Sequence, residues 1–283
     1  MERARGLIEL TRPGNALTSG LLTAIGALVA GTATTAGLFV DASAPVRAAA
    51  AVLATMLAVG AGNAINDYFD REIDAINQPG RPIPRGAVTP SETLAFAAVQ
   101  FGVAVGLVLA LPPLAVAIAV VNLVALVAYT KLFKGLPGVG NVVVGGLGGS
   151  TFLFGGTAVG GEVGPVVVLA ALAALATFAR EIIKDVEDID GDREKGLNTL
   201  PIAIGERRAL QVAMAALLVG IAGSPLPYLL SGFGVAYLVA VAVPDLLMLT
   251  AGYWGFTDPT RGQLWLKYGQ LLAAGAFILG RFT

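Results

Sequence analysis

The stretch "AAAVLATMLAVGAGNAINDYFDREID", residues 49–74, runs from an apolar segment directly into three aspartates, Asp67, Asp70 and Asp74. Carboxylates are costly next to hydrocarbon, so acidic side chains at the end of a membrane-like segment indicate function. The whole chain is similarly apolar: of its 283 residues, 56% are hydrophobic and 13% charged, and the mean hydropathy is +0.79. Soluble domains carry about 25% charged residues. The composition therefore predicts an all-α, polytopic membrane protein.

The missing residue types limit the chemistry. The chain has no cysteine and no histidine, which excludes disulfides, thiolate chemistry, the commonest general base and the usual zinc ligand. The net charge of −1 indicates no nucleic-acid partner, and no obligate protein partner is inferred. Any reaction has to rest on Asp, Glu, Asn, Lys, Arg, Tyr and the backbone.

Apolar runs long enough to cross a bilayer recur along the chain, since a spanning helix needs about 20 such residues. We predict nine transmembrane helices in a single transmembrane domain, residues 1–283. The predicted spans are 16–39, 46–68, 91–111, 113–133, 138–159, 165–186, 207–229, 232–255 and 263–281.

The basic residues predict the orientation. With nine spans, all of the 18 lysines and arginines except Arg47 and Arg281 fall on the side of the N-terminus. Cytoplasmic loops are enriched in Lys and Arg, so the N-terminus and the active face are predicted to be cytoplasmic and the C-terminus outside the cell membrane.

A second acidic stretch, "REIIKDVEDIDGDREKGLNTLP" at residues 180–201, repeats the first. Asp185, Asp188 and Asp192 have the same D-x2-D-x3-D spacing as the first trio. On a continuous helix, each trio falls within about 60° of one face. Upstream on the same alignment, Asn63 matches Glu181 and Asn66 matches Lys184. Both trios end an even-numbered span, so they are predicted to face one cavity from the same side of the membrane.

Six facing carboxylates repel each other unless cations lie between them. Mg²⁺ prefers oxygen ligands and commonly bridges carboxylates to phosphate oxygens. We therefore expect Mg²⁺ as the cofactor and a prenyl diphosphate, with its tail in the bilayer, as the substrate. Nearby cations are available for the remaining phosphate oxygens: Arg81, Arg85, Lys131, Lys134, Lys184 and Arg193. The bland alternative is that both clusters are ordinary solvated helix ends.

These residues resemble the UbiA superfamily of intramembrane prenyltransferases. "NDYFDREID" and "DVEDIDGD" are similar to its two aspartate motifs, "GRPIPRGAVT" to the segment after the first motif, and "YTKLFK" to its Tyr and Lys stretch. The resemblance implies nine transmembrane helices around a central cavity with a cytoplasmic polar cap. It also implies Mg²⁺-dependent loss of diphosphate from an allylic donor and alkylation of a lipid acceptor.

The resemblance assigns roles to residues at matching positions. Metal ligands are expected at Asn66, Asp67, Asp70, Asp74, Asp185, Asp188 and Asp192. Catalytic roles are expected for Asp70, Asp74, Asp188, Asp192, Tyr129 and Lys134, with Lys131 competing with Lys134. Among the substrate contacts, the resemblance implies Arg12 and Asn15, on the acceptor side. The position and charge of the other candidates beside the two motifs predict further substrate contacts from Asn63, Arg81, Arg85, Lys131, Glu181 and Lys184.

The acceptor is left open at this point. The wording of residues 180–205 most resembles the archaeal enzymes that transfer a geranylgeranyl group to geranylgeranylglyceryl phosphate. An aromatic acceptor such as 4-hydroxybenzoate is the alternative within the family. An intramembrane CDP-alcohol phosphotransferase is disfavoured because its acids form a single run, and a transporter is disfavoured because both clusters lie on one face.

Two further features have local interpretations. The glycines of "GGLGGS", residues 145–150, lack the Gly-Lys-Ser/Thr of a P-loop and are expected to serve close helix packing or to make room for the prenyl chain. Asp245 follows Pro244 inside the eighth span. A locally satisfied carboxylate and a functional one both fit that position.

Overall fold

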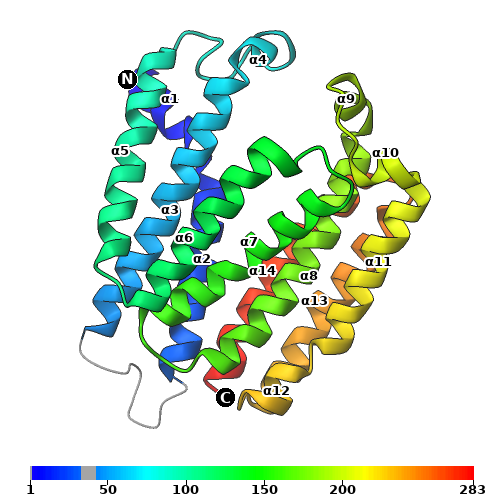
Figure 1. The fold of residues 1–283 in the computed structure, drawn as a ribbon. Helices are drawn as coiled ribbons and strands as arrows, with labels where there is room; N and C mark the ends of the chain where they lie inside the picture. Colours follow the sequence, from blue (N-terminus) through cyan, green and yellow to red (C-terminus); the bar gives the residue numbers. More distant parts are fainter. Residues whose placement is uncertain (1, 33–42) are drawn as a thin grey trace.

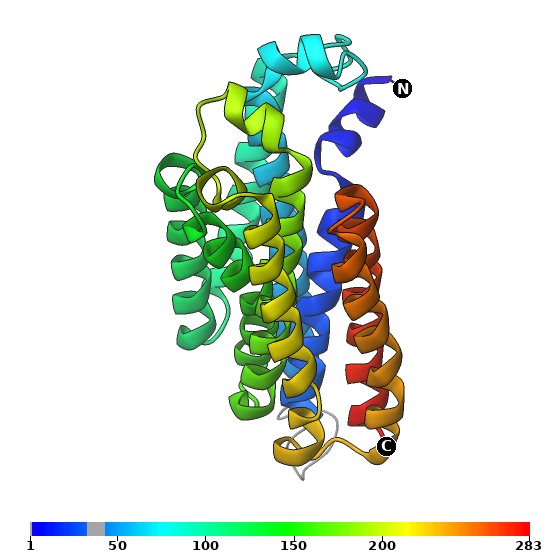
Figure 2. The same cartoon turned by 90° about the vertical axis from the view of Figure 1, so that its right-hand side faces the viewer.

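Helices make up all the regular structure in the computed structural model, which describes residues 2–32 and 43–283. The predicted all-α class is correct for this part of the chain. Nine longer helices run side by side through the described residues (Figures 1 and 2): α2 (Pro13–Thr32), α3 (Ala44–Phe69), α5 (Pro90–Leu109), α6 (Pro113–Ala128), α7 (Val139–Ala158), α8 (Val163–Glu187), α11 (Glu206–Gly223), α13 (Val235–Trp254) and α14 (Pro259–Arg281).

Short helices complete the described chain: α1 (Glu2–Leu10), α4 (Arg71–Asn77), α9 (Ile189–Glu194), α10 (Leu200–Ile204) and α12 (Leu226–Leu230). The end of the first predicted span, residues 33–39, lies outside the described residues.

Seven described segments are long and apolar enough to cross a membrane: α2, α3, α5, α7, α8, the α11–α12 segment and α13. Helix α6 is shorter, with 16 residues, and α14 carries Arg261, Lys267 and Arg281. Only 22% of the most apolar window of α5 is buried inside the protein, so most of that apolar surface faces outward, as in a membrane. The chain is a multi-pass membrane protein.

Local sequence explains where several helices begin and end. Helix α5 begins at a capping box, in which Thr89 Oγ1 accepts from the Glu92 N–H (3.2 Å) and Glu92 Oε2 accepts from the Thr89 N–H (2.9 Å). The predicted span 113–133 ends earlier as an α-helix, because Tyr129–Phe133 forms a π-helical turn. The predicted span 207–229 is divided at Ser224, before the prolines of α12.

Helix α7 lies at the centre of the packing, against α2, α6 and α8. Its glycines allow this: a Cβ on Gly149 would lie 2.3 Å from the carbonyl oxygen of Ala170, and one on Gly155 would lie 1.9 Å from that of Thr23. Gly145 and Gly148 also face α8, whereas a Cβ on Gly146 would meet nothing within 4 Å. Close packing is therefore the role of most of the predicted glycine stretch.

Two ends of the bundle differ in character. Helices α1, α4 and α9 lie at one end, and the C-terminus lies at the other (Figure 1). At the C-terminal end, the guanidinium of Arg47 donates to the Val159 carbonyl (3.1 Å) and that of Arg281 to the Ser231 carbonyl (3.2 Å). The two arginines that the charge pattern separated from the rest therefore cap the opposite end.

Candidate active site

The aspartate trios occupy equivalent positions in the backbone. Asp70 ends α3 and precedes α4, and Asp188 ends α8 and precedes α9. Their dihedral angles match, with φ −86° and ψ 1° at Asp70 and φ −90° and ψ 4° at Asp188. Each N–H donates to the carbonyl four residues earlier at 2.9 Å. The sequence repeat is thus also a structural repeat, and both copies lie at the same end of the bundle (Figure 1).

The prediction that each trio lies on one continuous helix is wrong. The long helix ends at the middle aspartate, so Asp74 and Asp192 lie on the short helices α4 and α9. The acidic side chains between the aspartates of each trio point outward: Glu72 is 87% exposed and Asp190 is 93% exposed.

Two arginines pair with the first and third acids of the first trio. Asp67, only 6% exposed, accepts from Arg12 Nη2 at 2.6 Å and from Arg81 Nη1 at 3.3 Å. The same Arg81 nitrogen lies 2.6 Å from Asp74 Oδ2. One guanidinium therefore joins the first and third acids despite the break between their helices. Charge-assisted pairs of this kind satisfy carboxylates that burial would otherwise penalise.

The joint between α1 and α2 is held onto this cluster. Arg12 has a left-handed backbone with φ 46°, a conformation that costs a residue with a side chain about 1–2 kcal/mol. Asn63 Nδ2 donates to the Thr11 carbonyl beside it at 3.0 Å. The hydrogen bond at Thr11 and the ion pair to Asp67 fix a strained turn, which places the Arg12 guanidinium over the acids.

The remaining predicted residues of the first segment separate into two groups. Asn15, Asn66 and Asp70 are exposed and accessible to a ligand. Arg85 is not brought to the acids: its guanidinium donates to Glu9 Oε2 on α1 (2.7 Å) and to the Gly80 carbonyl (2.7 Å). Arg85 thus attaches α1 to the loop after α4, because a carboxylate on α1 lies within its reach.

A small pocket forms beside the second trio. The π-helical turn and the starts of α7 and α10 meet α8 there, and the residues with polar side chains that line it are Tyr129, Lys134, Asn141, Glu181, Asp185 and Thr199. Four of these were predicted from the motifs. The side chain of Lys131 lies outside the described part, so the competition between Lys131 and Lys134 is not decided by contacts.

Two pocket residues were missed from the sequence. Asn141, 5% exposed, donates from Nδ2 to Asp185 Oδ2 at 2.7 Å, and the buried Thr199 Oγ1 has no hydrogen-bond partner in the described structure. A signal existed for Asn141, since it is a single amide at the start of an otherwise apolar span. Thr199 follows the loop after α9, as the N-cap of α10, and carries no such signal.

The second trio lacks the arginines of the first. Lys184 Nζ lies 3.8 Å from Asp188 Oδ2 in a loose, half-exposed pair. Burial, together with the nearby charge of Asp188, raises the pKa of Asp192 above its ordinary value. Glu181 instead accepts from Arg180 Nη1 at 3.0 Å. The carboxylates of the second trio therefore have fewer neighbouring cationic side chains than those of the first trio.

These donor sets fit a hard divalent cation. No three carboxylates converge into a ready-made metal site within the described ranges, in contrast to the predicted carboxylate rims. The reason is electrostatic: acids without a cation between them separate or pair with arginine. Asp188 and Asp192 supply carboxylate oxygens at a place where added positive charge would relieve repulsion, which matches the preference of Mg²⁺.

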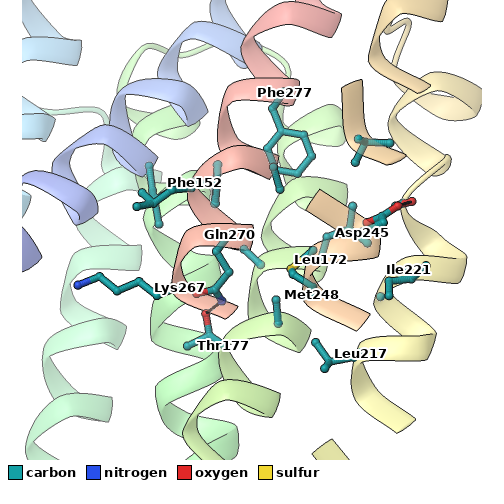
Figure 3. A pocket seen from close by; sticks show the side chains of 18 of the residues that line it. Phe152, Leu172, Thr177, Leu217, Ile221, Asp245, Met248, Lys267, Gln270 and Phe277 are labelled. Carbon is teal, nitrogen blue, oxygen red and sulfur yellow. Dashed lines mark hydrogen bonds between the residues drawn. The ribbon is translucent and has the colours of Figure 1, made fainter. Parts of the chain in front are cut away.

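A second, apolar chamber lies deeper in the bundle, between α2, α7, α8, α11, α13 and α14 (Figure 3). It holds about 820 Å³ of space free of protein atoms, including its open side, and Leu172, Leu217, Met248 and Phe277 are among its apolar walls. At one edge, Ser224 Oγ donates to Asp245 Oδ2 at 2.5 Å. Asp245 is therefore satisfied locally, by a serine in the turn between α11 and α12.

Comparison with known proteins identifies relatives of this chain in sequence and in structure. A family model described as the UbiA prenyltransferase family matches residues 21–278. A Natronomonas pharaonis protein named digeranylgeranylglyceryl phosphate synthase is 63% identical over 284 residues, covering 100% of this chain and 99% of its own. A solved structure of a digeranylgeranylglyceryl phosphate synthase is similar with a TM-score of 0.80 at 34% identity, covering 99% of both chains. A UbiA homologue from Archaeoglobus fulgidus bound to GPP and Mg²⁺ shares the fold, with a TM-score of 0.70 at 18% identity, covering 97% of this chain and 98% of that one.

Proposed function

Because the chain belongs to the UbiA prenyltransferase family, whose members transfer prenyl groups in membranes, we propose its two substrates. The donor is geranylgeranyl diphosphate and the acceptor is geranylgeranylglyceryl phosphate. The observation that carries this choice is the 63% identity, over the full length of both chains, to a protein named for that product. In the reaction, the bond between the prenyl C1 and the diphosphate oxygen breaks. An ether bond then forms between C1 and a glycerol oxygen, and the hydroxyl proton is taken up by the departing diphosphate.

The donor diphosphate is proposed to bind between the two acidic repeats, with residues 1–283 acting as one domain. Asp70 and Asp188 occupy equivalent helix ends on the same side of the bundle, and both are exposed. Magnesium is the proposed metal, held by Asn66 and the trio that includes Asp70 and by the trio that includes Asp188. When bound, it offsets the negative charge of the diphosphate.

Side chains of this protein supply the rest of the charge balance. Arg81 already spans the acids of the first repeat, so its guanidinium is placed where phosphate oxygens are proposed to bind. Lys134 and Tyr129 line the pocket at the second repeat. The apolar chamber is proposed to receive the prenyl chain, whose packing there would help to keep water from an allylic cation.

The site is proposed to face the cytoplasm as a polar cap on nine transmembrane helices, with the C-terminus outside. Helices α1, α4 and α9 gather at one end together with most of the basic residues, while Arg47 and Arg281 lie at the other end (Figure 1). This distribution supports the orientation expected from positive charge in cytoplasmic loops. Helices α6 and α14 supply the two additional spans.

The test supplies the purified protein with Mg²⁺, geranylgeranyl diphosphate and either geranylgeranylglyceryl phosphate or 4-hydroxybenzoate, with products identified by mass spectrometry. The expected product is the diether phosphate. Prenylation of the benzoate alone would reject the proposal and favour a quinone precursor as product.

Matched variants test the proposed site. Asp70→Asn and Asp188→Asn are expected to lower turnover on the order of 100-fold or more, because each would remove a carboxylate proposed to hold the Mg²⁺ that offsets the charge of the diphosphate. The exposed neighbours provide controls: Glu72→Gln and Asp190→Asn are expected to keep near-normal turnover. Similar rates in a site variant and its control, with both proteins monodisperse in detergent, would exclude that aspartate from the site.

A further inference from the structure

Lys267 is a cation inside the bundle that the acidic site does not use. It lies eight residues into α14, about 12 Å along the helix from Pro259, and its side chain lines the apolar chamber. In Figure 3 it extends from α14 to the side of the chamber opposite Asp245. The described residues offer no carboxylate within ion-pair distance of it. A charged side chain within a spanning segment is costly unless it serves a polar partner or a ligand.

Polar groups on two facing helices surround Lys267. Along α14, Gln263, Lys267 and Gln270 fall on one face, at positions i, i+4 and i+7. Gln270 Nε2 donates to Thr177 Oγ1 on α8 at 3.1 Å (Figure 3), and Arg180 Nη2 lies 3.5 Å from Gln263 Oε1. Lys267 therefore lies between two contacts that join α14 to α8.

Arg180 adds an unused donor to this polar band. Its Nη1 is engaged by Glu181 Oε1, but its Nε is buried and has no hydrogen-bond partner in the described structure. Buried donors without partners are rare and costly, and a bound acceptor would satisfy this one. The band thus offers one uncompensated ammonium and one unsatisfied guanidinium N–H, in chemistry suited to a phosphate.

The depth of the band separates it from the diphosphate site. Thr177 precedes Asp185, the first aspartate of the second trio, by eight residues and Asp188 by eleven, or about 12–17 Å along α8, and Arg180 lies between Thr177 and the site. A diphosphate held between the acidic repeats does not extend that far down the helix. A ligand at Lys267 would be a second anion, and the chamber walls of Leu172, Leu217 and Met248 suit an apolar chain attached to it.

We propose that Lys267, with Arg180, binds the phosphate of the acceptor lipid, and that the apolar chamber receives part of an isoprenoid chain. This inference rests on the proposed function, because an aromatic acceptor has no phosphate to bind. It assigns to Lys267 the choice between a phosphorylated and an unphosphorylated glycerol lipid.

The test compares two acceptors that differ only in this group, geranylgeranylglyceryl phosphate and geranylgeranylglycerol, with the full-length enzyme in detergent. Lys267→Met is expected to raise KM for the phosphorylated acceptor about tenfold or more, the loss of a charged hydrogen bond. KM for geranylgeranyl diphosphate and turnover of geranylgeranylglycerol are expected to stay within about twofold. Lys267→Arg is expected to restore most of the affinity, and Arg208→Met, an exposed cation on α11, serves as the control.

Each result has a separate meaning. Equal losses with both acceptors would overturn the inference, and so would a raised KM for the donor, which would assign Lys267 to the diphosphate. If the wild-type enzyme prenylates neither glycerol lipid, the proposed function itself fails. If it prenylates the phosphorylated lipid and Lys267→Met does so with unchanged KM, only the inference fails. If Lys267→Met does not fold, Lys267→Gln, which keeps a polar side chain but removes the charge, carries the same expectations.

Discussion

Gly149 on α7 offers a test of how closely this bundle is packed. A Cβ added there would lie 2.3 Å from the Ala170 carbonyl oxygen, whereas ordinary contact begins at 3.4 Å, a deficit of 3.4 − 2.3 = 1.1 Å. Backbone atoms on both sides cannot turn away, so α7 and α8 have to separate by about that distance. A gap near 1 Å removes roughly half of the dispersion energy across a contact.

Gly149→Ala is therefore expected to destabilise the protein by about 1–3 kcal/mol, after allowing for the better helix propensity of alanine. For a protein of this size, that lowers the melting temperature by roughly 3–10 °C. The assay is thermal denaturation of the purified protein in detergent, followed by the loss of monodisperse protein on size exclusion. Prenyl transfer is expected to fall as well, because the α7–α8 contact also positions Asn141 against Asp185.

Gly146→Ala on the same helix is the matched control. Its Cβ would meet nothing within 4 Å, so the melting temperature is expected to stay the same or rise by up to about 3 °C. A Gly149→Ala protein as stable as Gly146→Ala would refute the proposed close approach of α7 and α8.

Two further predictions concern charge. Millimolar Mg²⁺ is expected to stabilise the wild-type protein, by about 2.7 kcal/mol at 100 times Kd, and so to raise its melting temperature, whereas Asp192→Asn is expected not to respond. Because the pKa of Asp192 is raised, the asparagine variant is also expected to be more stable than the wild type at neutral pH without metal. A metal response in the variant would contradict the prediction. Hydrogen bonds from Arg85 and Arg5 lower the pKa of Glu9 below its ordinary 4.5. Helix α1 is therefore expected to stay attached as the pH falls to 4.5 and to loosen only below that pH. Amide hydrogen exchange along α1 would measure this, and loosening above pH 4.5 would count against these contacts.

Hydropathy and spacing predicted much of this fold, because burial in a bilayer requires long apolar helices. The predicted span 165–186 corresponds to Val163–Glu187, and 46–68 to Ala44–Phe69. The π-helical turn at Tyr129–Phe133 and the helix breaks at Asp70 and Asp188 were not predictable, since a 3.6-residue period continues through all three.

The motifs predicted which residues belong to the candidate site, but not which side chains they contact. The contact between Arg12 and Asp67 joins positions 55 residues apart, and Arg85 turns to Glu9 across a still longer interval. Such pairs depend on where α1 docks, and nothing in the local pattern specifies that. Asn141 was overlooked for the opposite reason, because one amide in an apolar run is easily attributed to helix packing.

The two chain ends leave the bundle at opposite ends (Figure 1), which matters for anyone who attaches a reporter to this enzyme. A fluorescent protein or affinity tag joined ahead of α1 shares a compartment with both aspartate repeats. In the proposed topology of nine spans, the same tag joined after α14 lies on the other side of the bilayer. Paired fusions, read by protease protection in sealed vesicles, would therefore reveal from which aqueous phase the enzyme draws its water-soluble ligands.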